Sequence, residues 1–551
     1  MSNIHFETSP KDYQHWTYQI DGAVAHLSMN VNPDGGLFDG YELKKNSYDL
    51  GVDIELHDAI QRLRFEHPEV RVVVLRSGLE RMFCAGANIK MLGGASHAHK
   101  VNFCKFTNET RNAMEDASEN SGQRYIAALS GTAAGGGYEL ALATDYILLV
   151  DDGSAAVSLP EIPLLAVLPG TGGLTRLADK RRVRRDLADM FCTTEEGVRG
   201  KKAVDWRLVD ETIPASDFEN RLAVLTSEIV AVSDRPMDAE GISLSPLERT
   251  ITEEGIVYSL ITVEVHRQDA IAIITIRGPE SAPPLDAKGI QVEGANFWPL
   301  AVTRQLDDAL LHLRLNETKI GMLIFRTEGD ARRCASYDQL ILDERENWLV
   351  REIILYWKRT MKRVDVTSRT LIAEILPGSC FCGFLAEVLF AADRTYMLDG
   401  QFEGDNRAAA TIRLTEANFG LFPMANGLGR LETRFLGEPQ TLDMTQNLIG
   451  KDLAGQDAFN IGLVTVAPDD IDWEDEIRML IEERTSYSPD SLTAMESNLR
   501  FAGPETMETR IFGRLSAWQN WIFQRPNAVG DDGALELYGT GRRPKYHKER
   551  V

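Results

Sequence analysis

GTAAGGGYELALATD, residues 131–145, sets three consecutive glycines before a helix-like segment and places Glu139 directly ahead of the apolar run 140–143. A run of glycines usually marks a flexible turn, and a glutamate in the first turn of a helix usually complements the helix dipole. A glycine loop that opens a helix also presents backbone N–H groups at close range. An oxygen that gains negative charge during a reaction can bind there. The rest of the chain decides between these interpretations.

The stretch has a counterpart later in the chain, and so do three other segments. Glu139 stands six residues before Asp145, and Glu387 stands six residues before Asp393 in GFLAEVLFAADRTYML. In the same order along the chain, the matched pairs are 20–29 with 268–276, 72–88 with 321–338, and 159–177 with 414–431. A general likeness of α/β segments is the alternative, but it explains one match more easily than four collinear ones. We therefore interpret the chain as a tandem duplication.

Short apolar runs alternate with helical patterns inside each copy, which is typical of an α/β fold. The first predicted domain covers residues 1–240 and the second covers residues 259–466. The segment 241–258 between them is interpreted as a linker. Beyond residue 466 the pattern becomes helical, so that 467–551 is predicted to be a helical C-terminal region.

The formal net charge of −24 and a pI near 4.9 argue against a nucleic-acid surface and against an anionic membrane as partner. An anionic substrate must therefore meet a local basic patch. The chain has no long apolar run and its start lacks the order of a signal peptide, so we expect a cytoplasmic protein. Its six cysteines are expected to be free thiols. His97, His99 and Cys104 resemble a metal site but lack a fourth ligand, so no metal is expected.

Three segments of the first copy carry the motifs: FCAGANIKML (83–92), AAGGGYE (133–139) and SLPEI (158–162), the last followed by PGTGG (169–173). Together they resemble the signatures of the crotonase superfamily, over most of residues 15–230. Each motif alone is weak, whereas all of them in the family's order are specific. The resemblance implies tandem crotonase-like domains of the ββα superhelix type, with a helical C-terminal region, and an acyl-coenzyme A thioester as substrate without a separate cofactor.

The resemblance also implies roles for individual residues. The N–H groups of Ala87 and Gly136 match the family's oxyanion hole, and the small neighbours Gly86 and Gly135 are expected to contact the substrate. Glu139 and Glu161 match the two acids that hydratases of the family use to activate water and move a proton. Lys90 is the candidate for a coenzyme A phosphate, and Cys104 lies on the segment that lines the acyl pocket in the family. A dipole partner for Glu139 and a helix-capping surface acid for Glu161 are the alternatives.

Two departures from the family pattern and one basic cluster bear on these assignments. Asn88 stands where the family usually has Asp, and eight positions instead of seven separate Glu161 from Pro169. The cluster 176–186, RLADKRRVRRD, is either a solvated helix face or a phosphate contact.

The second copy keeps Glu387 and Glu416 but has changed loops. CAGAN has become CASYD and GGGYE has become GFLAE, so that Tyr337 and Phe384 are expected to fill the space of a substrate carbonyl. We therefore predict that the second copy is a scaffold without catalysis. We also expect the chain to form a homo-oligomer, with a dimer favoured. The functions considered are a lyase or hydrolase that uses water, a hydratase or isomerase of another enoyl-CoA, and a non-catalytic acyl-CoA-binding protein.

Overall fold

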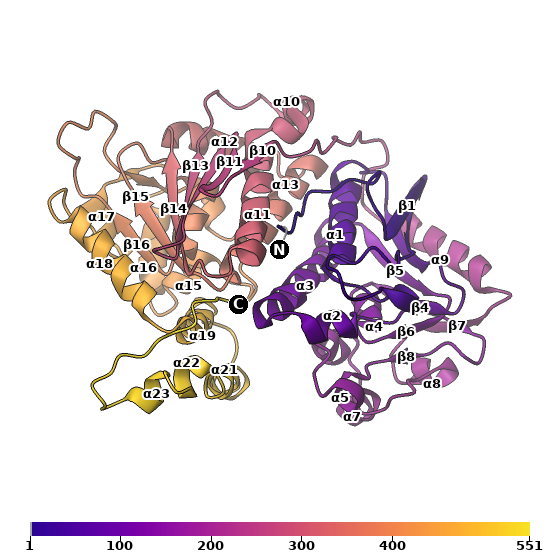
Figure 1. The fold of residues 1–551 in the computed structure, drawn as a ribbon. Helices are drawn as coiled ribbons and strands as arrows, with labels where there is room; N and C mark the ends of the chain where they lie inside the picture. The colour runs from indigo at the N-terminus through magenta and orange to yellow at the C-terminus, as the bar shows by residue number, and fades with distance from the viewer. Residues whose placement is uncertain (1–2) are drawn as a thin grey trace. The chain divides into compact units, whose positions relative to one another are not determined.

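The computed structural model describes residues 3–551, which form two compact units, 5–246 and the larger unit built on 247–551 (Figure 1). The boundary between them falls within the predicted linker. No helix in the part of the chain that the structure describes is both long and apolar enough to cross a membrane.

The first unit is built on a six-stranded sheet in the order β1-β2-β3-β5-β7-β9. Its strands are β1 (Trp16–Asp21), β2 (Val24–Met29), β3 (Val72–Ser77), β5 (Arg124–Leu129), β7 (Tyr146–Asp151) and β9 (Glu211–Pro214). Only β1 runs antiparallel to its neighbour. The central strands are nearly continuous apolar runs such as VVVL in β3, as expected of parallel strands that are covered on both faces.

Helices connect these strands, and a second, small sheet of three strands lies beside them in the same unit. Its strands are β4 (Met82–Cys84), β6 (Thr132–Ala134) and β8 (Val157–Ser158), all parallel. The helices are α1 (Leu50–Phe65), α2 (Ile89–Gly94), α3 (His97–Asn120), α4 (Gly136–Leu142), α5 (Glu161–Leu165), α6 (Gly173–Thr175), α7 (Arg185–Cys192), α8 (Gly200–Asp205) and α9 (Phe218–Val232), with a π-helical turn η2 (Arg176–Lys180) and a 3₁₀ turn η1 (Lys44–Asn46).

The second unit repeats this plan around a seven-stranded sheet, β10-β11-β12-β13-β14-β15-β16. Its strands are β10 (Arg249–Ile251), β11 (Gly255–Tyr258), β12 (Ile261–His266), β13 (Ile271–Arg277), β14 (Met322–Glu328), β15 (Thr370–Ile375) and β16 (Arg394–Met397). The run β12 to β16 has the same order and directions as β1-β2-β3-β5-β7. The predicted duplication is therefore visible in the topology.

The helices of the second unit are more numerous than its strands. They are α10 (Ala287–Glu293), α11 (Trp298–Asn316), α12 (Ala331–Asp343), α13 (Trp348–Asp365), α14 (Ala386–Ala391), α15 (Arg430–Arg434), α16 (Pro439–Gln446), α17 (Gly455–Asn460), α18 (Trp473–Ser486), α19 (Pro489–Arg500), α20 (Met507–Arg510), α21 (Ser516–Ile522), α22 (Pro526–Val529) and α23 (Ala534–Leu537). Short turns η3 (Gly294–Asn296), η4 (Gly383–Leu385), η5 (Glu416–Asn418) and η6 (Ile511–Leu515) and a two-stranded sheet of β17 (Ile412–Arg413) and β18 (Asp452–Leu453) complete it.

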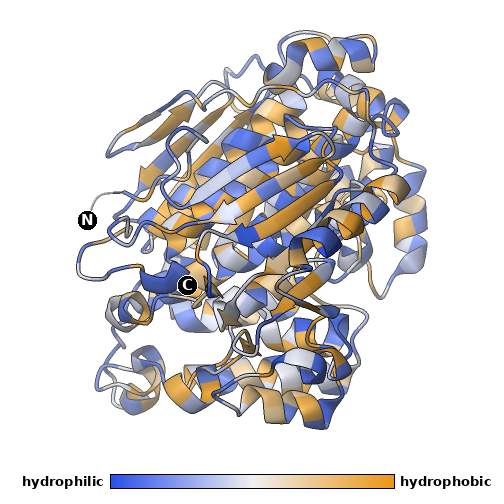
Figure 2. Cartoon of the chain, turned by 90° about the vertical axis from the view of Figure 1, so that its right-hand side faces the viewer, coloured by the Kyte–Doolittle hydropathy of each residue, from blue (hydrophilic) through white to orange (hydrophobic). Residues whose placement is uncertain are grey.

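The structure differs from two of the predicted boundaries. The end of the predicted linker 241–258 forms β10 and β11, which extend the second sheet. The predicted helical region 467–551 is helical, but α18 packs Trp473 and Leu480 into the same apolar cluster as Ile324 and Ile372 of the sheet. The compact unit built on the second sheet therefore includes α18. Figure 2 shows apolar residues in orange along the strands, interspersed with polar residues in blue.

Candidate active site

The small sheet β4-β6-β8 brings three distant segments of the chain together. Cys84 at the end of β4 pairs with Ala133 in β6, and Ala134 pairs with Ser158 in β8. The strands are parallel, so their carboxyl ends lie at one edge, and the chain leaves that edge into the segments 85–88, 135–139 and 159–161. These are the three segments that carry the predicted site.

The first turn holds Ala87 through a short parallel pairing with Tyr48. The Tyr48 N–H donates to Gly86 O (3.0 Å), and the Asn88 N–H donates to Tyr48 O (2.8 Å). Gly86 has φ +90°, which favours glycine, and Asn88 accepts a hydrogen bond from the Met91 N–H (3.0 Å) as the cap of α2. In this pairing the amide of Ala87 itself points away from Tyr48.

The second turn starts α4 with Gly135 at φ +50° and Gly136 as its first residue. A Cβ built on Gly86 would lie 2.9 Å from Gly136 N, so the two turns are in direct contact. A Cβ on Gly136 would lie 2.1 Å from the hydroxyl oxygen of Tyr48. Within residues 3–551 the N–H groups of Ala87 and Gly136 donate to no other group. Two backbone N–H groups without a partner, on adjacent turns of small residues, can both donate hydrogen bonds to one carbonyl oxygen.

Glu139 lies one turn into α4, buried, and its carboxylate only accepts hydrogen bonds. Its Oε1 receives the N–H groups of Thr171 (3.0 Å) and Gly173 (2.7 Å), and its Oε2 receives the Thr171 hydroxyl. A Cβ on Gly173 would lie 2.8 Å from Glu139 Oε1, so the close contact between Glu139 and the backbone at position 173 also requires a glycine. The loop before α6 thus fixes the orientation of this acid.

Glu161 is the first residue of α5 and is 9% exposed. Its Oε1 lies 2.7 Å from the place of a Cβ on Gly135, and its Oε2 has no hydrogen-bond partner within the described residues. Burial, followed by the charge of Glu139, raises the pKa of Glu161 to about 7, while Arg111 acts in the opposite direction. The two acids therefore share one electrostatic environment, in which one can carry a proton near neutral pH.

Cys104 on α3 belongs to the same neighbourhood. Burial, followed by the charge of Glu139, raises the pKa of this thiol to about 11, which keeps it protonated. Its Sγ lies 3.8 Å from the place of a Cβ on Gly170, in the loop that leads to Thr171.

Lys90 lies on the outer side of the first turn. It lines a pocket of about 530 Å³ together with Ala87, Asn88 and Lys44. Lys44 is paired with Glu42 across 2.6 Å. The pocket thus joins the Ala87 turn to exposed cationic side chains on an otherwise acidic protein.

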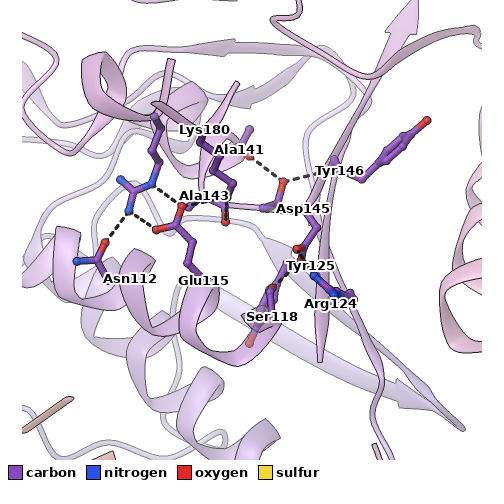
Figure 3. A network of polar contacts seen from close by, with 12 residues as sticks. Asn112, Glu115, Ser118, Arg124, Tyr125, Ala141, Ala143, Asp145, Tyr146 and Lys180 are labelled. Carbon is purple, nitrogen blue, oxygen red and sulfur yellow. Dashed lines mark hydrogen bonds and ion pairs between the residues drawn. The ribbon is translucent and has the colours of Figure 1, made fainter. Parts of the chain in front are cut away.

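Part of the basic cluster 176–186 has a structural role, whereas Arg182, Arg184 and Arg185 are exposed to solvent. Arg176 and Lys180 both pair with Glu115 of α3, across 2.8 and 2.9 Å. Lys180 also donates to Ala143 O (2.8 Å) and so caps the C-terminal end of α4, as Figure 3 shows. In the same view Asp145 accepts the Tyr125 N–H (2.7 Å) and ties the chain after α4 to the large sheet. These contacts support the helix that carries Glu139.

The comparisons with known proteins identify the family of the chain. The family model described as enoyl-CoA hydratase/isomerase matches residues 42–239. Benzoyl-CoA-dihydrodiol lyase of Aromatoleum evansii is 52% identical over 100% of this chain and 98% of the relative.

The chain belongs to the enoyl-CoA hydratase/isomerase family, the crotonase superfamily. Carnitinyl-CoA dehydratase of Proteus mirabilis is 28% identical over 34% of this chain and 67% of the relative. Among solved structures, enoyl-CoA hydratase from Bacillus anthracis is 28% identical, covers 40% of this chain and 77% of that chain, and has a TM-score of 0.34.

The crotonase motifs identify only part of the site. Tyr48, Arg111 and Thr171 contact both turns and Glu139, but the sequence analysis assigned none of them to the site. The signal available in the sequence for Thr171 is its place within PGTGG. Tyr48 and Arg111 carry no local signal, since they meet the motifs only through the fold.

The second unit does not rebuild a crotonase site. Glu387 is buried and bound to Asn418 (2.8 Å) and Arg430 (3.1 Å), whereas Glu416 is exposed. The ring of Phe384 packs against Trp298 and Trp357, with centroids 5.1 and 4.8 Å apart. Tyr337 packs against Phe297 and Trp298. Aromatic side chains therefore fill this region, and its two acids are not brought together.

Proposed function

We propose that this chain is a ring-opening lyase that converts 2,3-epoxybenzoyl-CoA with water to 3,4-didehydroadipyl-CoA semialdehyde and formate in aerobic benzoate degradation. The observation that carries the proposal is the end-to-end similarity to benzoyl-CoA-dihydrodiol lyase, 52% identity over the whole chain. This similarity includes the second unit and the helical C-terminal region, whereas the match to carnitinyl-CoA dehydratase covers 34% of the chain.

In the proposed mechanism the thioester oxygen binds between the N–H groups of Ala87 and Gly136, which stabilise enolate character as the ring opens. Gly86 and Gly135 keep both turns free of side chains. Glu139, fixed by Thr171 and Gly173, acts together with Glu161 to activate water and move protons. Glu161 transfers protons, because its pKa near 7 lets it exchange them at neutral pH.

The coenzyme A part of the substrate is proposed to lie along the pocket beside Ala87, with a phosphate near Lys90. Cys104, a neutral thiol beside the acid pair, is proposed to line the acyl pocket. The mechanism uses no separate cofactor.

The test is product release from enzymatically generated 2,3-epoxybenzoyl-CoA. We expect formate and a CoA-bound semialdehyde in equal amounts, and their absence with active substrate would reject the proposal. Hydration of crotonyl-CoA in the same preparation, without formate, would instead support the alternative of an enoyl-CoA hydratase or isomerase. That alternative is favoured by the family match to residues 42–239, which covers the whole acid pair. Binding of CoA esters without any turnover would support a non-catalytic acyl-CoA-binding protein.

We also propose a cytoplasmic homo-oligomer, with a dimer favoured. The support is the segment from α20 to α21, none of whose residues is buried, although it carries Phe512 (74% exposed) and Leu515 (51% exposed). Apolar side chains in such number on one helical segment are typical of a surface that a second copy covers. Phe512→Glu should shift the mass measured by light scattering from dimer to monomer; a wild-type monomer would reject the proposal.

A further inference from the structure

Arg111 is a buried cation in the middle of α3, 1% exposed, and it binds three separate segments of the first unit. Its Nη1 donates to Thr171 O (2.8 Å). Its Nη2 donates to Gly136 O (2.8 Å) and to the Tyr48 hydroxyl (3.0 Å). A guanidinium has donors in a fixed planar fork, so these three contacts set the relative positions of the segments.

Each of these segments holds one part of the proposed machinery. Gly136 supplies one oxyanion amide, and its carbonyl faces Arg111. Tyr48 pairs with Ala87, which supplies the other amide. Thr171 donates both its N–H and its hydroxyl to Glu139. Arg111 thus contacts Gly136 directly, and it reaches Ala87 through Tyr48 and Glu139 through Thr171.

The charge of Arg111 is balanced within the same region. The titratable groups whose charges act on it are Tyr48, Glu139 from α4 and Asp53 from α1. Its charge in turn lowers the pKa of Glu161 in α5 and of the thiols of Cys84 and Cys104. Loss of the guanidinium would therefore remove the cation that opposes the effect of burial on Glu161.

We propose that Arg111 is a positioning residue that sets the spacing of the Ala87 amide, the Gly136 amide and Glu139 without touching the substrate. This inference rests on the proposed function for its reaction, but its geometry does not depend on which CoA ester reacts. A burial role alone would make any residue of similar size acceptable, whereas positioning requires the planar fork.

The test compares Arg111→Lys and Arg111→Met with Arg235→Lys. Arg235 is also buried in this unit and binds main-chain carbonyls of Ser121 and Arg64, away from the site. We expect Arg111→Lys to fold and to lose about 100-fold or more in kcat while KM for the CoA ester changes only a few-fold, because misplacement of reacting groups costs rate. We expect Arg235→Lys to lower the melting temperature and to keep kcat.

A second measurement separates this inference from the proposed reaction. An infrared titration of the carboxyl band of Glu161 needs no substrate. The band is identified by its loss in Glu161→Gln. Its midpoint should move to higher pH in Arg111→Met and stay unchanged in Arg235→Lys. An unchanged midpoint together with wild-type kcat in a folded Arg111→Met would overturn the positioning role. If the midpoint shifts in Arg111→Met but the wild-type enzyme releases no formate, the role of Arg111 stands and the proposed reaction is rejected.

Discussion

The carboxylate of Glu161 lies directly against Gly135, the residue that precedes the Gly136 amide. A Cβ at position 135 would lie 2.7 Å from Glu161 Oε1, and Gly135 adopts φ +50°. The buried acid Glu161 and the start of the proposed oxyanion turn therefore occupy adjacent positions, and the absence of one methyl group makes this possible. The Gly-Gly-Gly run is a structural requirement of the site and not a flexible turn.

Gly135→Ala should reduce the rate by about 100-fold or more, because the added methyl displaces Glu161 in addition to straining the turn. Gly22→Ala is the matched control, since Gly22 has φ +57° and nothing within 4 Å of an added Cβ. It should cost about 1 kcal/mol of stability from backbone strain and leave the rate unchanged. Equal rates for Gly135→Ala and wild type would contradict the adjacency of acid and turn.

Glu161→Gln should lower the rate by two or more powers of ten, the usual contribution of a positioned acid or base. The wild-type profile of kcat/KM against pH should have a limb near pH 7, where the pKa of Glu161 lies. A rate that rises with pH identifies Glu161 as the base, and one that falls identifies it as the acid. Formate release by Glu161→Gln at the wild-type rate would exclude the two-acid mechanism.

The same substitution should stabilise the fold at alkaline pH. The pKa of Glu161 is raised from 4.5 to about 7, so the folded chain holds this proton more tightly than the unfolded chain does. Stability is therefore lost as pH rises from about 4.5 to 7, and the loss is complete above that range. Glu161→Gln does not lose this stability, so its free energy of unfolding should exceed that of wild type by about 1–3 kcal/mol at pH 8. Urea titrations at pH 5.5 and 8 measure this gap, which should widen with pH; a constant gap would contradict it.

The sequence predicted what depends on residue type and order along the chain. The turns at Gly86 and Gly135 need positive φ, and glycine in the sequence signals this directly. The duplication was likewise visible from collinear matches. Arg111 could not be predicted, because its partner Tyr48 is 63 residues away and the contact exists only after the sheets form. The exposed position of Glu416 could not be predicted either. The sequence around it still has an acid before a glycine-rich segment, although the fold around that acid has changed.

Lys90→Gln should raise KM for the CoA ester several-fold with little change in kcat, because a phosphate contact acts equally on ground and transition states. Lys90 is on the pocket beside Ala87, whereas Lys201 forms an exposed pair with Asp205 and serves as the control in Lys201→Gln. The effect of Lys90→Gln should shrink as salt concentration rises. An unchanged KM at low salt would place the phosphates elsewhere.

The second unit should bind no CoA ester, because its own Asp338 occupies the amide that corresponds to Gly136. The Phe384 N–H donates to Asp338 Oδ2 (3.1 Å), and the Thr415 hydroxyl donates to the same oxygen (2.8 Å). Gly383 keeps φ +50°, as Gly135 does, so the turn persists while a carboxylate fills its opening. A side-chain oxygen already held by this amide excludes a thioester oxygen.

Calorimetry with a non-reacting CoA ester should therefore give one site per chain. Gly136→Ala should remove that site, because its Cβ would lie 2.1 Å from the Tyr48 hydroxyl oxygen. Circular dichroism and the unfolding midpoint of the variant establish that its units remain folded. Two sites in wild type, or one site that survives in folded Gly136→Ala, would show that the second unit binds ligand despite Asp338. Substrate would then have to displace the side chain of Asp338 from this amide. The two hydrogen bonds and the burial of Asp338 oppose that displacement.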